Sequence, residues 1–211
     1  MRLRKYDEAI LSLSKSEKLF ENISNLYASD ANNTSPDTNL HFLQHFPGYI
    51  VCLNSLAQCF HLNKEFERSN DMYLRVLNIR AFVYSKYHPD YSCTVNCLGL
   101  LKLDMNEIEE AIRYFQLALK LRDEVFGKSH PSYAVVLVNL SLVYSKKNNY
   151  AWAGRLLEEA IEIYRKAFGK KSPEVAKCLY NLERLLISQG NESLTQELHS
   201  YINEIKPDIY K

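Results

Sequence analysis

Apolar positions recur along this 211-residue chain at spacings of three and four residues, in long segments that short polar breaks separate. Leu53, Leu56 and Phe60, for example, fall on one face of a helix. A polar break follows at 61–65, and a second patterned segment starts at Phe66. Strands are not expected, because alternation by two is absent and the segments run far past strand length. The pattern predicts pairs of antiparallel helices joined by a tight turn.

The unit recurs at a fixed interval. The stretch FGKSHPSYAVVLVNL at 126–140 is matched by related stretches that begin at 42, 84 and 168. The prolines of the four copies lie 42 residues apart, at Pro47, Pro89, Pro131 and Pro173. A constant period of this size is typical of a repeat protein. Gly127 suits the left-handed position just past a helix, and Pro131 suits the first turn of the next helix.

The second helices of the first three units carry small residues seven positions apart with a bulky residue between them. These triplets are Ser69, Tyr73 and Val76; Ala111, Phe115 and Ala118; and Ala153, Leu157 and Ala160. Residues at this spacing share one helical face. We therefore expect the two helices of a unit to approach closely along this face.

These residues resemble the tetratricopeptide repeat, whose usual period is about 34 residues. The longer form, with a glycine before a His-Pro pair, resembles the repeats of kinesin light chain and related scaffold proteins. Asn139-Leu140, Asn181-Leu182 and the EEA stretch at 109–111 also look like that subgroup. The resemblance implies an all-α, helical-hairpin solenoid with a right-handed superhelix. Armadillo and HEAT repeats and propeller blades share similar periods, but three-helix units and strands do not fit this pattern.

The ends of the chain depart from the repeat. We expect 1–27 to hold the second helix of an incomplete repeat, a long helix around 4–27, and 28–46 to be an insert or linker. Four repeats follow, in 47–88, 89–130, 131–172 and 173–211, and the last of them includes a C-terminal tail. The turn-forming stretch of the insert is 28–39. The first helix of the incomplete repeat would precede Met1. The sequence is then either a piece of a longer protein, which we favour, or starts on an unpaired helix.

Composition narrows the class of protein. A charged share of 24% and an apolar share of 46% are ordinary for a globular chain. A net charge of +1 gives no electrostatic case for binding nucleic acid. No apolar run approaches the roughly 20 residues that span a bilayer. Asp7 and Glu8 interrupt the apolar residues near the start of the sequence, so this stretch lacks the apolar core of a signal peptide. We expect a cytoplasmic protein.

The five cysteines are odd in number and lie in apolar helical pattern: Cys52, Cys59, Cys93, Cys97 and Cys178. This favours buried, reduced thiols over a disulfide framework. Cys93 and Cys97 share a helical face, and Cys52 and Cys59 lie on the preceding repeat, so zinc held by four thiolates is conceivable. Small buried hydrophobes are the more usual role of helical thiols. His41 and His45 have the same spacing but no third ligand, and we predict no metal site.

Catalytic signatures are missing. The sequence holds no glycine-rich phosphate loop, no Gly-x-Ser-x-Gly elbow and no His-Glu-x-x-His motif, so we expect neither an enzyme nor a cofactor. His88 and His130 precede repeat prolines, and Ser172 takes the equivalent place. A position that accepts such different residues is structural, so we expect packing or helix capping. The tyrosines two residues after three of the prolines are expected to form a packed spine: Tyr49, Tyr91 and Tyr133.

A groove is the expected functional surface. Stacked helix pairs curve, and their first helices line the concave side. The family resemblance implies that three positions of each first helix face this groove: Val51, Ser55 and Gln58; Cys93, Cys97 and Leu100; Val135, Asn139 and Leu142; and Lys177, Asn181 and Arg184. Three repeats offer a mostly apolar floor, and the last offers two cations and an amide. The asparagines can donate to and accept from a peptide backbone.

Two classes of function fit this surface. The favoured one is a non-enzymatic scaffold that binds a peptide segment of a partner protein, with apolar anchors and an acidic group near Lys177 and Arg184. The alternative is a structural assembly subunit whose groove is filled by its own chain or by a second copy. Lys177 and Asn181 also resemble half of the clamp with which some co-chaperones hold a C-terminal carboxylate, but the other clamp positions do not match.

Overall fold

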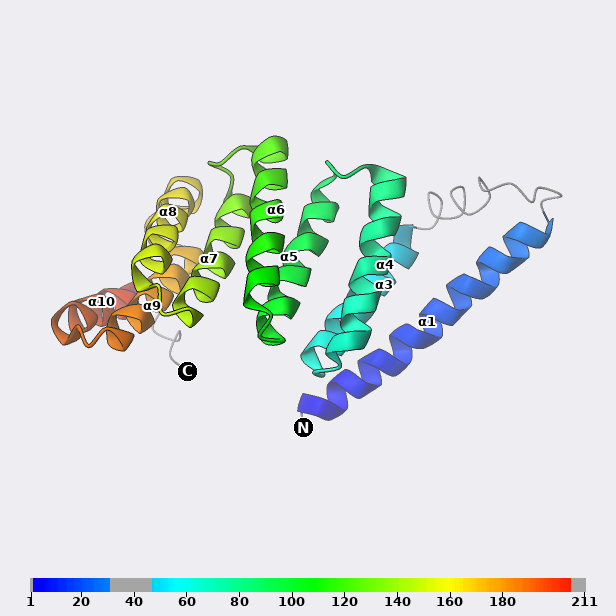
Figure 1. Ribbon diagram of the computed structural model, residues 1–211, viewed down its shortest axis with the longest axis horizontal. Coiled ribbons are helices and arrows are strands. Elements are labelled where there is room, and N and C mark those ends of the chain that lie inside the picture. Colours follow the sequence, from blue (N-terminus) through cyan, green and yellow to red (C-terminus); the bar gives the residue numbers. More distant parts are fainter. Residues whose placement is uncertain (1, 31–46, 206–211) are drawn as a thin grey trace. The chain divides into compact units, whose positions relative to one another are not determined.

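The computed structural model describes residues 2–30 and 47–205, and within them it contains helices and no strand (Figure 1). The helices are α1 (Arg2–Asp30), α3 (Pro47–Leu62), α4 (Phe66–Tyr84), α5 (Pro89–Asp104), α6 (Ile108–Phe126), α7 (Pro131–Lys146), α8 (Tyr150–Phe168), α9 (Pro173–Ser188) and α10 (Glu192–Ile205). The all-α helical-hairpin class is therefore confirmed. The four repeat prolines are the first residues of α3, α5, α7 and α9.

The first helix is longer than the sequence pattern predicts. α1 runs to Asp30, so residues 28–30 are helical rather than part of an insert. Serine, alanine and tyrosine near this end do not break a helix, and the strong turn formers of the stretch lie further on. The remainder of the predicted insert, with His41 and His45, lies outside the described residues.

Contacts divide the chain into two compact units. Unit 1 comprises Met1–Glu107, in which α1 packs on α3, α3 on α4, and α4 on α5. Unit 2 comprises Ile108–Lys211, in which each helix from α6 to α10 packs on the next. In each unit, neighbours in sequence are neighbours in space, as expected when every repeat contacts only the repeats beside it.

The residue before three of the repeat prolines caps the following helix. The ring nitrogen Nδ1 of His88 accepts a hydrogen bond from the backbone N–H of Asp90 at 3.2 Å, and His130 accepts one from Ser132 at 3.1 Å. Ser172 does the same at the start of α9, where its hydroxyl accepts from Val175 at 3.3 Å. These bonds satisfy N–H groups that have no partner within the helix. The prediction of a structural role for these residues is confirmed.

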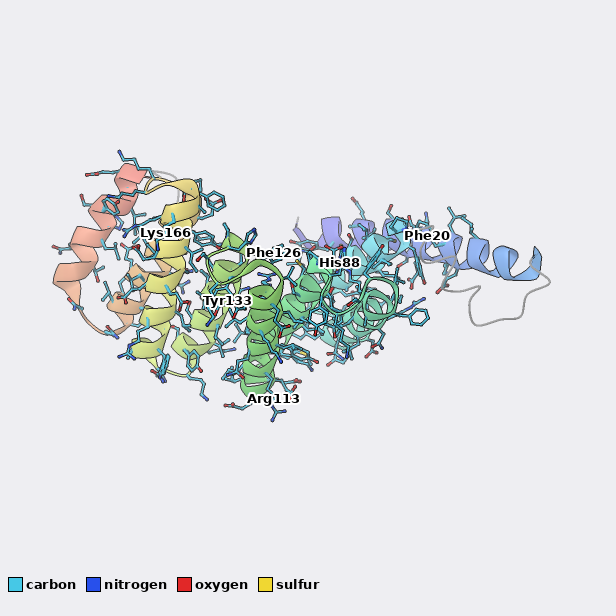
Figure 2. All side chains as sticks on the ribbon, turned by 90° about the horizontal axis from the view of Figure 1, so that it is seen from above. Phe20, His88, Arg113, Phe126, Tyr133 and Lys166 are labelled. Atoms are coloured by element: carbon cyan, nitrogen blue, oxygen red, sulfur yellow. The ribbon has the colours of Figure 1, made fainter. Side chains whose placement is uncertain are left out.

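Both histidines also stack on an aromatic residue four positions earlier. The ring centroids of His88 and Tyr84 are 4.7 Å apart, and those of His130 and Phe126 are 4.5 Å apart. Figure 2 shows His88 and Phe126 at these turns. The stacked pair fixes the path of the chain between one helix pair and the next.

The turn between repeats uses a left-handed backbone. Gly127 and Gly169 have φ of 79° and 89°, as predicted for Gly127. The same position between α4 and α5 holds Ser85, with φ of 79° and ψ of 155°. Glycine adopts this region freely, but a residue with a side chain is strained there. The first repeat boundary therefore carries strain that the later ones avoid.

The core follows the small and bulky pattern of the second helices. Ala153, Leu157 and Ala160 of α8 are fully buried, as are Ser69 and Val76 of α4. The Ser69 hydroxyl donates a hydrogen bond to the Ala57 carbonyl oxygen at 2.8 Å, so α3 and α4 approach closely at this small residue. The predicted tyrosine spine is buried too, with 5%, 8% and 9% exposure at Tyr49, Tyr91 and Tyr133. Those rings are packing residues.

Candidate functional site

The predicted groove positions are all at least partly exposed. In unit 1, Val51, Gln58 and Cys93 are exposed, and Ser55, Cys97 and Leu100 are half-buried; in unit 2, Val135, Leu142, Lys177 and Arg184 are exposed, and Asn139 and Asn181 are half-buried. Their neighbours on the same helices, such as Leu53, Leu137 and Leu179, are buried. The exposed fraction is 40% at Val135 and 38% at Leu142, which is high for apolar residues of the first helices. The twelve positions thus form accessible surface in each unit.

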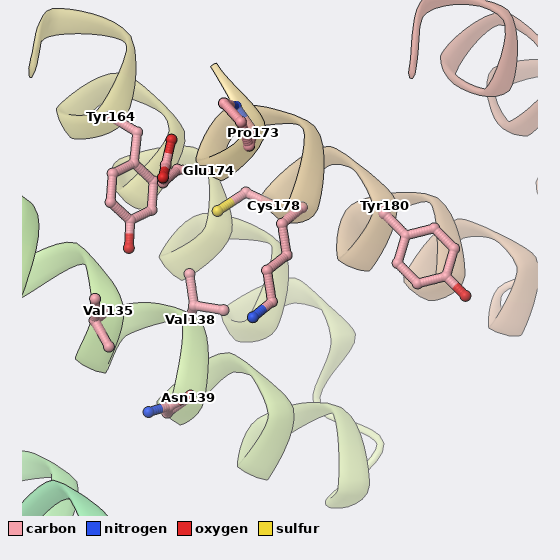
Figure 3. Close-up of a pocket in the computed structure, with 9 residues that line it drawn as sticks. Val135, Val138, Asn139, Tyr164, Pro173, Glu174, Cys178 and Tyr180 are labelled. Atoms are coloured by element: carbon pink, nitrogen blue, oxygen red, sulfur yellow. The ribbon is translucent and has the colours of Figure 1, made fainter. Parts of the chain in front are cut away.

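A hollow in unit 2 joins part of this surface into one site (Figure 3). It has a volume of about 620 Å³ and lies where α7, α8 and α9 meet. Its lining consists of Val135, Val138, Asn139, Tyr164, Pro173, Glu174, Lys177, Cys178 and Tyr180. Three of the predicted groove residues, Val135, Asn139 and Lys177, are therefore brought together. Leu142, Asn181 and Arg184 do not line this hollow.

The walls of the hollow are mostly apolar and chemically quiet. The pKa of the Cys178 thiol is raised to about 12, chiefly by burial, with a smaller lowering by the Lys177 charge and a raising by the Glu174 carboxylate. Burial also raises the pKa of the Tyr164 hydroxyl to about 12, with Cys178 and Glu174 acting in the same direction. Both groups therefore stay protonated near neutral pH. A thiol in this state is neither a nucleophile nor a metal ligand.

The cationic end predicted on α9 is accessible. Lys177 and Arg184 are exposed, and neither forms an ion pair within the described residues. They lie seven residues apart, so they project from the same side of the helix. Two unpaired cations on one helical face can attract an acidic ligand, chiefly by steering it toward the site.

A smaller hollow in unit 1 has most of its charged lining residues in ion pairs. It measures about 300 Å³, and it is lined by Ser14, Glu17, Phe60, Arg68, Asp71, Met72 and Arg75. The Arg75 guanidinium contacts carboxylate oxygens of Glu17 at 2.8 Å and Glu21 at 3.1 Å. The Arg68 guanidinium lies 4.0 Å from the centre of the Phe60 ring. These contacts tie α1 and α3 to α4, so this hollow serves the packing of unit 1.

The cysteines differ in burial. Cys52 and Cys178 are buried, Cys59 and Cys97 are half-buried, and Cys93 is exposed, so the prediction that all five are buried is wrong for Cys93. The Cys97 thiol is hydrogen-bonded to Tyr73, whose pKa is raised mainly by burial. None of the five cysteines forms a disulfide, and no group of three or more metal-ligating side chains occurs among the described residues.

Several residues of the unit 2 hollow escaped the sequence analysis. Tyr164 lies at the end of a second helix, and Glu174 and Cys178 lie beside the predicted groove positions of α9. A signal for Tyr164 was present. The equivalent positions one and two repeats earlier, Arg122 and Arg80, are both arginine, and only a comparison along the 42-residue register shows the change.

Comparison with known proteins supports the repeat assignment. The model of the tetratricopeptide repeat family matches residues 90–166. Among curated proteins, no sequence matches this chain. No helix in the described residues is long and apolar enough to cross a membrane.

Solved structures resemble the chain over nearly its whole length. BtubC (BKLC) from P. vanneervenii gives a TM-score of 0.72 at 17% identity, covering 94% of this chain and 75% of that one. A putative kinesin light chain from P. anserina, with nearly identical repeats of the tetratricopeptide type, gives 0.66 at 18% identity, covering 97% and 94%. The apo form of RapI gives 0.65 at 17% identity, covering 97% and 70%. At such identities the likeness shows a common fold.

Proposed function

We propose, on the premise that this chain is a tetratricopeptide repeat protein whose repeats resemble those of kinesin light chains, that it holds a peptide segment of a partner protein against its first helices and has no catalytic chemistry of its own. Repeat solenoids present extended surfaces for binding other proteins. The hollow of unit 2 is the single observation that carries the proposal. It joins exposed groove residues of two successive first helices in a space large enough for side chains of a peptide.

The chemistry of this surface suggests how a peptide is held. Val135 and Leu142 offer apolar contacts, and binding energy in such grooves concentrates in a few buried anchors. Asn139 has both donor and acceptor groups for a peptide backbone. Lys177 and Arg184 favour an acidic group of the ligand at the α9 end.

Parallel capture from an extract of the source cells tests this proposal. Immobilised wild-type protein is compared with Asn139→Ala and Leu142→Asp, and with Leu117→Asp as a control. Leu117 lies in the same unit on the second helix α6 and is 40% exposed, against 38% for Leu142, so the two aspartates cost similar stability. We expect a partner that is lost from the Asn139→Ala and Leu142→Asp columns and kept on the Leu117→Asp column. Equal capture on all four columns would refute the proposal.

Self-assembly is the competing outcome. A groove filled by a second copy would leave no room for a partner, and the molar mass would then rise with protein concentration. Size-exclusion chromatography with light scattering, over a range of concentrations, measures this directly. A constant monomer mass supports the peptide scaffold.

A further inference from the structure

An arginine fastens one helix pair to the next inside unit 1. Arg80 lies near the end of α4, and its side chain is only 7% exposed. Its Nη1 group donates hydrogen bonds to the Asp90 carbonyl oxygen at 2.9 Å, to the Thr94 hydroxyl, and to the Asn54 side-chain oxygen at 3.4 Å. Its Nη2 lies 3.7 Å from the Asp90 carboxylate. A buried guanidinium thus occupies a site built from three helices.

The equivalent arginine of the next repeat makes a similar contact inside unit 2. Arg122 of α6 is 4% exposed and donates a hydrogen bond to the Ser132 carbonyl oxygen at the start of α7. Ser132 stands 42 residues after Asp90, and Arg122 stands 42 residues after Arg80. Two repeats therefore use one arrangement, in which a guanidinium at the end of a second helix binds the first carbonyls of the following helix.

The third repeat lacks the arginine and retains only the carboxylate among its partners. Tyr164 takes the place of Arg80 and Arg122 in the 42-residue register. The partners of Arg80, namely Asn54, Asp90 and Thr94, correspond to Val138, Glu174 and Cys178. All three of these residues, with Tyr164 itself, line the hollow of unit 2. The hollow is thus lined by the equivalents of every residue that holds the Arg80 guanidinium in unit 1.

Glu174 retains the anionic part of that environment. No hydrogen bond or ion pair engages its carboxylate among the described residues, although the equivalent Asp90 faces Arg80. Figure 3 shows Glu174 from α9 beside the ring of Tyr164 from α8. The pKa of Tyr164 is raised mainly by burial, and the Glu174 charge is close enough to add to that shift while the Arg122 charge lowers it. An unpaired carboxylate next to an aromatic face, in a mostly apolar hollow, suits a cation with an apolar stem.

Lys177 also lines the hollow and opposes a second cation there. Its side chain is exposed, so it can turn toward solvent when a ligand enters. The planar guanidinium suits this place better than an ammonium group, because it can pair with the carboxylate through two N–H groups and stack on the tyrosine ring.

We propose that the hollow of unit 2 receives an arginine side chain of the bound peptide, whose guanidinium pairs with the Glu174 carboxylate and stacks on Tyr164. The ligand would thus provide a guanidinium at the position where Arg80 and Arg122 provide one from the chain itself. The inference rests on the proposed peptide-binding function and adds the chemistry of one ligand position. An acidic group nearer Arg184 and an arginine at Glu174 would together fix the direction of the peptide.

N-acetyl-arginine methylamide is a suitable probe, and its citrulline analogue, which has the same shape without the charge, is the control. Titration of the isotope-labelled full chain, followed by NMR shifts of residues 164, 174 and 178, measures binding. For a probe of this size we expect a dissociation constant of about 1 mM. Citrulline should bind at least about tenfold more weakly, because it cannot form the ion pair.

Glu174→Gln should weaken arginine binding by a similar factor, whereas Glu158→Gln, at an exposed carboxylate of α8 outside the hollow, should leave it unchanged. Tyr164→Arg should abolish probe binding, because the internal arginine can then pair with Glu174 in place of the probe. Equal shifts with arginine and citrulline, no saturable shift at these residues, or full binding to Glu174→Gln would each overturn the inference. If Asn139→Ala and Leu142→Asp lose the partner in the capture experiment but the arginine probe does not bind, the peptide-binding function is supported and only the arginine assignment is refuted.

Discussion

Ser85→Gly should stabilise the protein, although it removes a side chain. Ser85 has φ of 79° and ψ of 155°, a combination that only glycine adopts without strain. Such an outlier costs about 1–3 kcal/mol in the folded state. The serine hydroxyl accepts one exposed hydrogen bond, from the backbone N–H of Tyr87 at 3.3 Å. The strain is the largest of the terms that the substitution changes.

Two smaller effects oppose the gain. Glycine loosens the unfolded chain and costs about 0.4–1 kcal/mol, and the lost hydrogen bond costs about 0.5 kcal/mol at an exposed site. The net stabilisation is then about 1 kcal/mol, which raises the melting temperature by about 2–4 °C for a chain of this size. Thermal unfolding followed by circular dichroism measures the shift, and urea unfolding gives the free energy independently.

The reverse substitution at the last boundary provides the matched control. Gly169 has φ of 89° and ψ of 164°, and a Cβ placed there would meet no atom within 4 Å, so Gly169→Ser adds backbone strain without a clash. It should destabilise the protein by about 1 kcal/mol. A Ser85→Gly variant that melts lower than wild type, or a Gly169→Ser variant that melts at the same temperature, would refute the strain argument.

Three further predictions concern packing, charge and thiol reactivity. Ala160→Leu should overpack the fully buried surface of α8 and lower the free energy of unfolding by about 1–3 kcal/mol; an unchanged urea midpoint would contradict the helix pairing. Reversal of Lys177 and Arg184 to Glu should weaken partner binding more at low than at high salt, since exposed charges are screened within about 10 Å at 0.1 M; a salt-independent loss in calorimetry would argue against steering. Iodoacetamide at mildly alkaline pH should label exposed Cys93 well before Cys178, because burial raises the pKa of Cys178 to about 12 and lowers its thiolate fraction; mass spectrometry of digests that shows equal rates would disprove this.

The fold was predictable because one signal recurs four times. A proline, a small residue pattern and a left-handed turn at fixed spacing each have a local physical cause, and repetition makes chance agreement improbable. His88 and His130 follow the same logic: Ser172 at the equivalent place predicts packing or helix capping, and the structure shows capping by all three residues. The division of the chain into an incomplete repeat, an insert and four repeats stays a prediction.

The candidate site was less predictable, because the hollow is lined by Tyr164, which stands in the third repeat in place of the arginine of the first two repeats, as well as by exposed groove residues. Exposure of Val135, Asn139 and Lys177 agrees with the family register, but their role in binding remains a prediction. The roles of Tyr164 and Glu174 follow from the structure, because they occupy the positions equivalent to Arg80 and to its partner Asp90. The exposure of Cys93 agrees with its predicted groove position and contradicts the expectation of a buried thiol, because an apolar pattern alone does not distinguish a covered helical face from an open one.

Site-specific crosslinking to the partner tests the central claim most directly. A photoreactive benzophenone amino acid is placed at position 142 on α7 or, as the control, at position 117 on α6, two sites of nearly equal exposure in the same unit. Our account predicts that the partner obtained by capture is crosslinked from position 142 and not from position 117. Crosslinking from position 117 alone would contradict it, and would move the interaction from the first helices to the outer surface of the second helices.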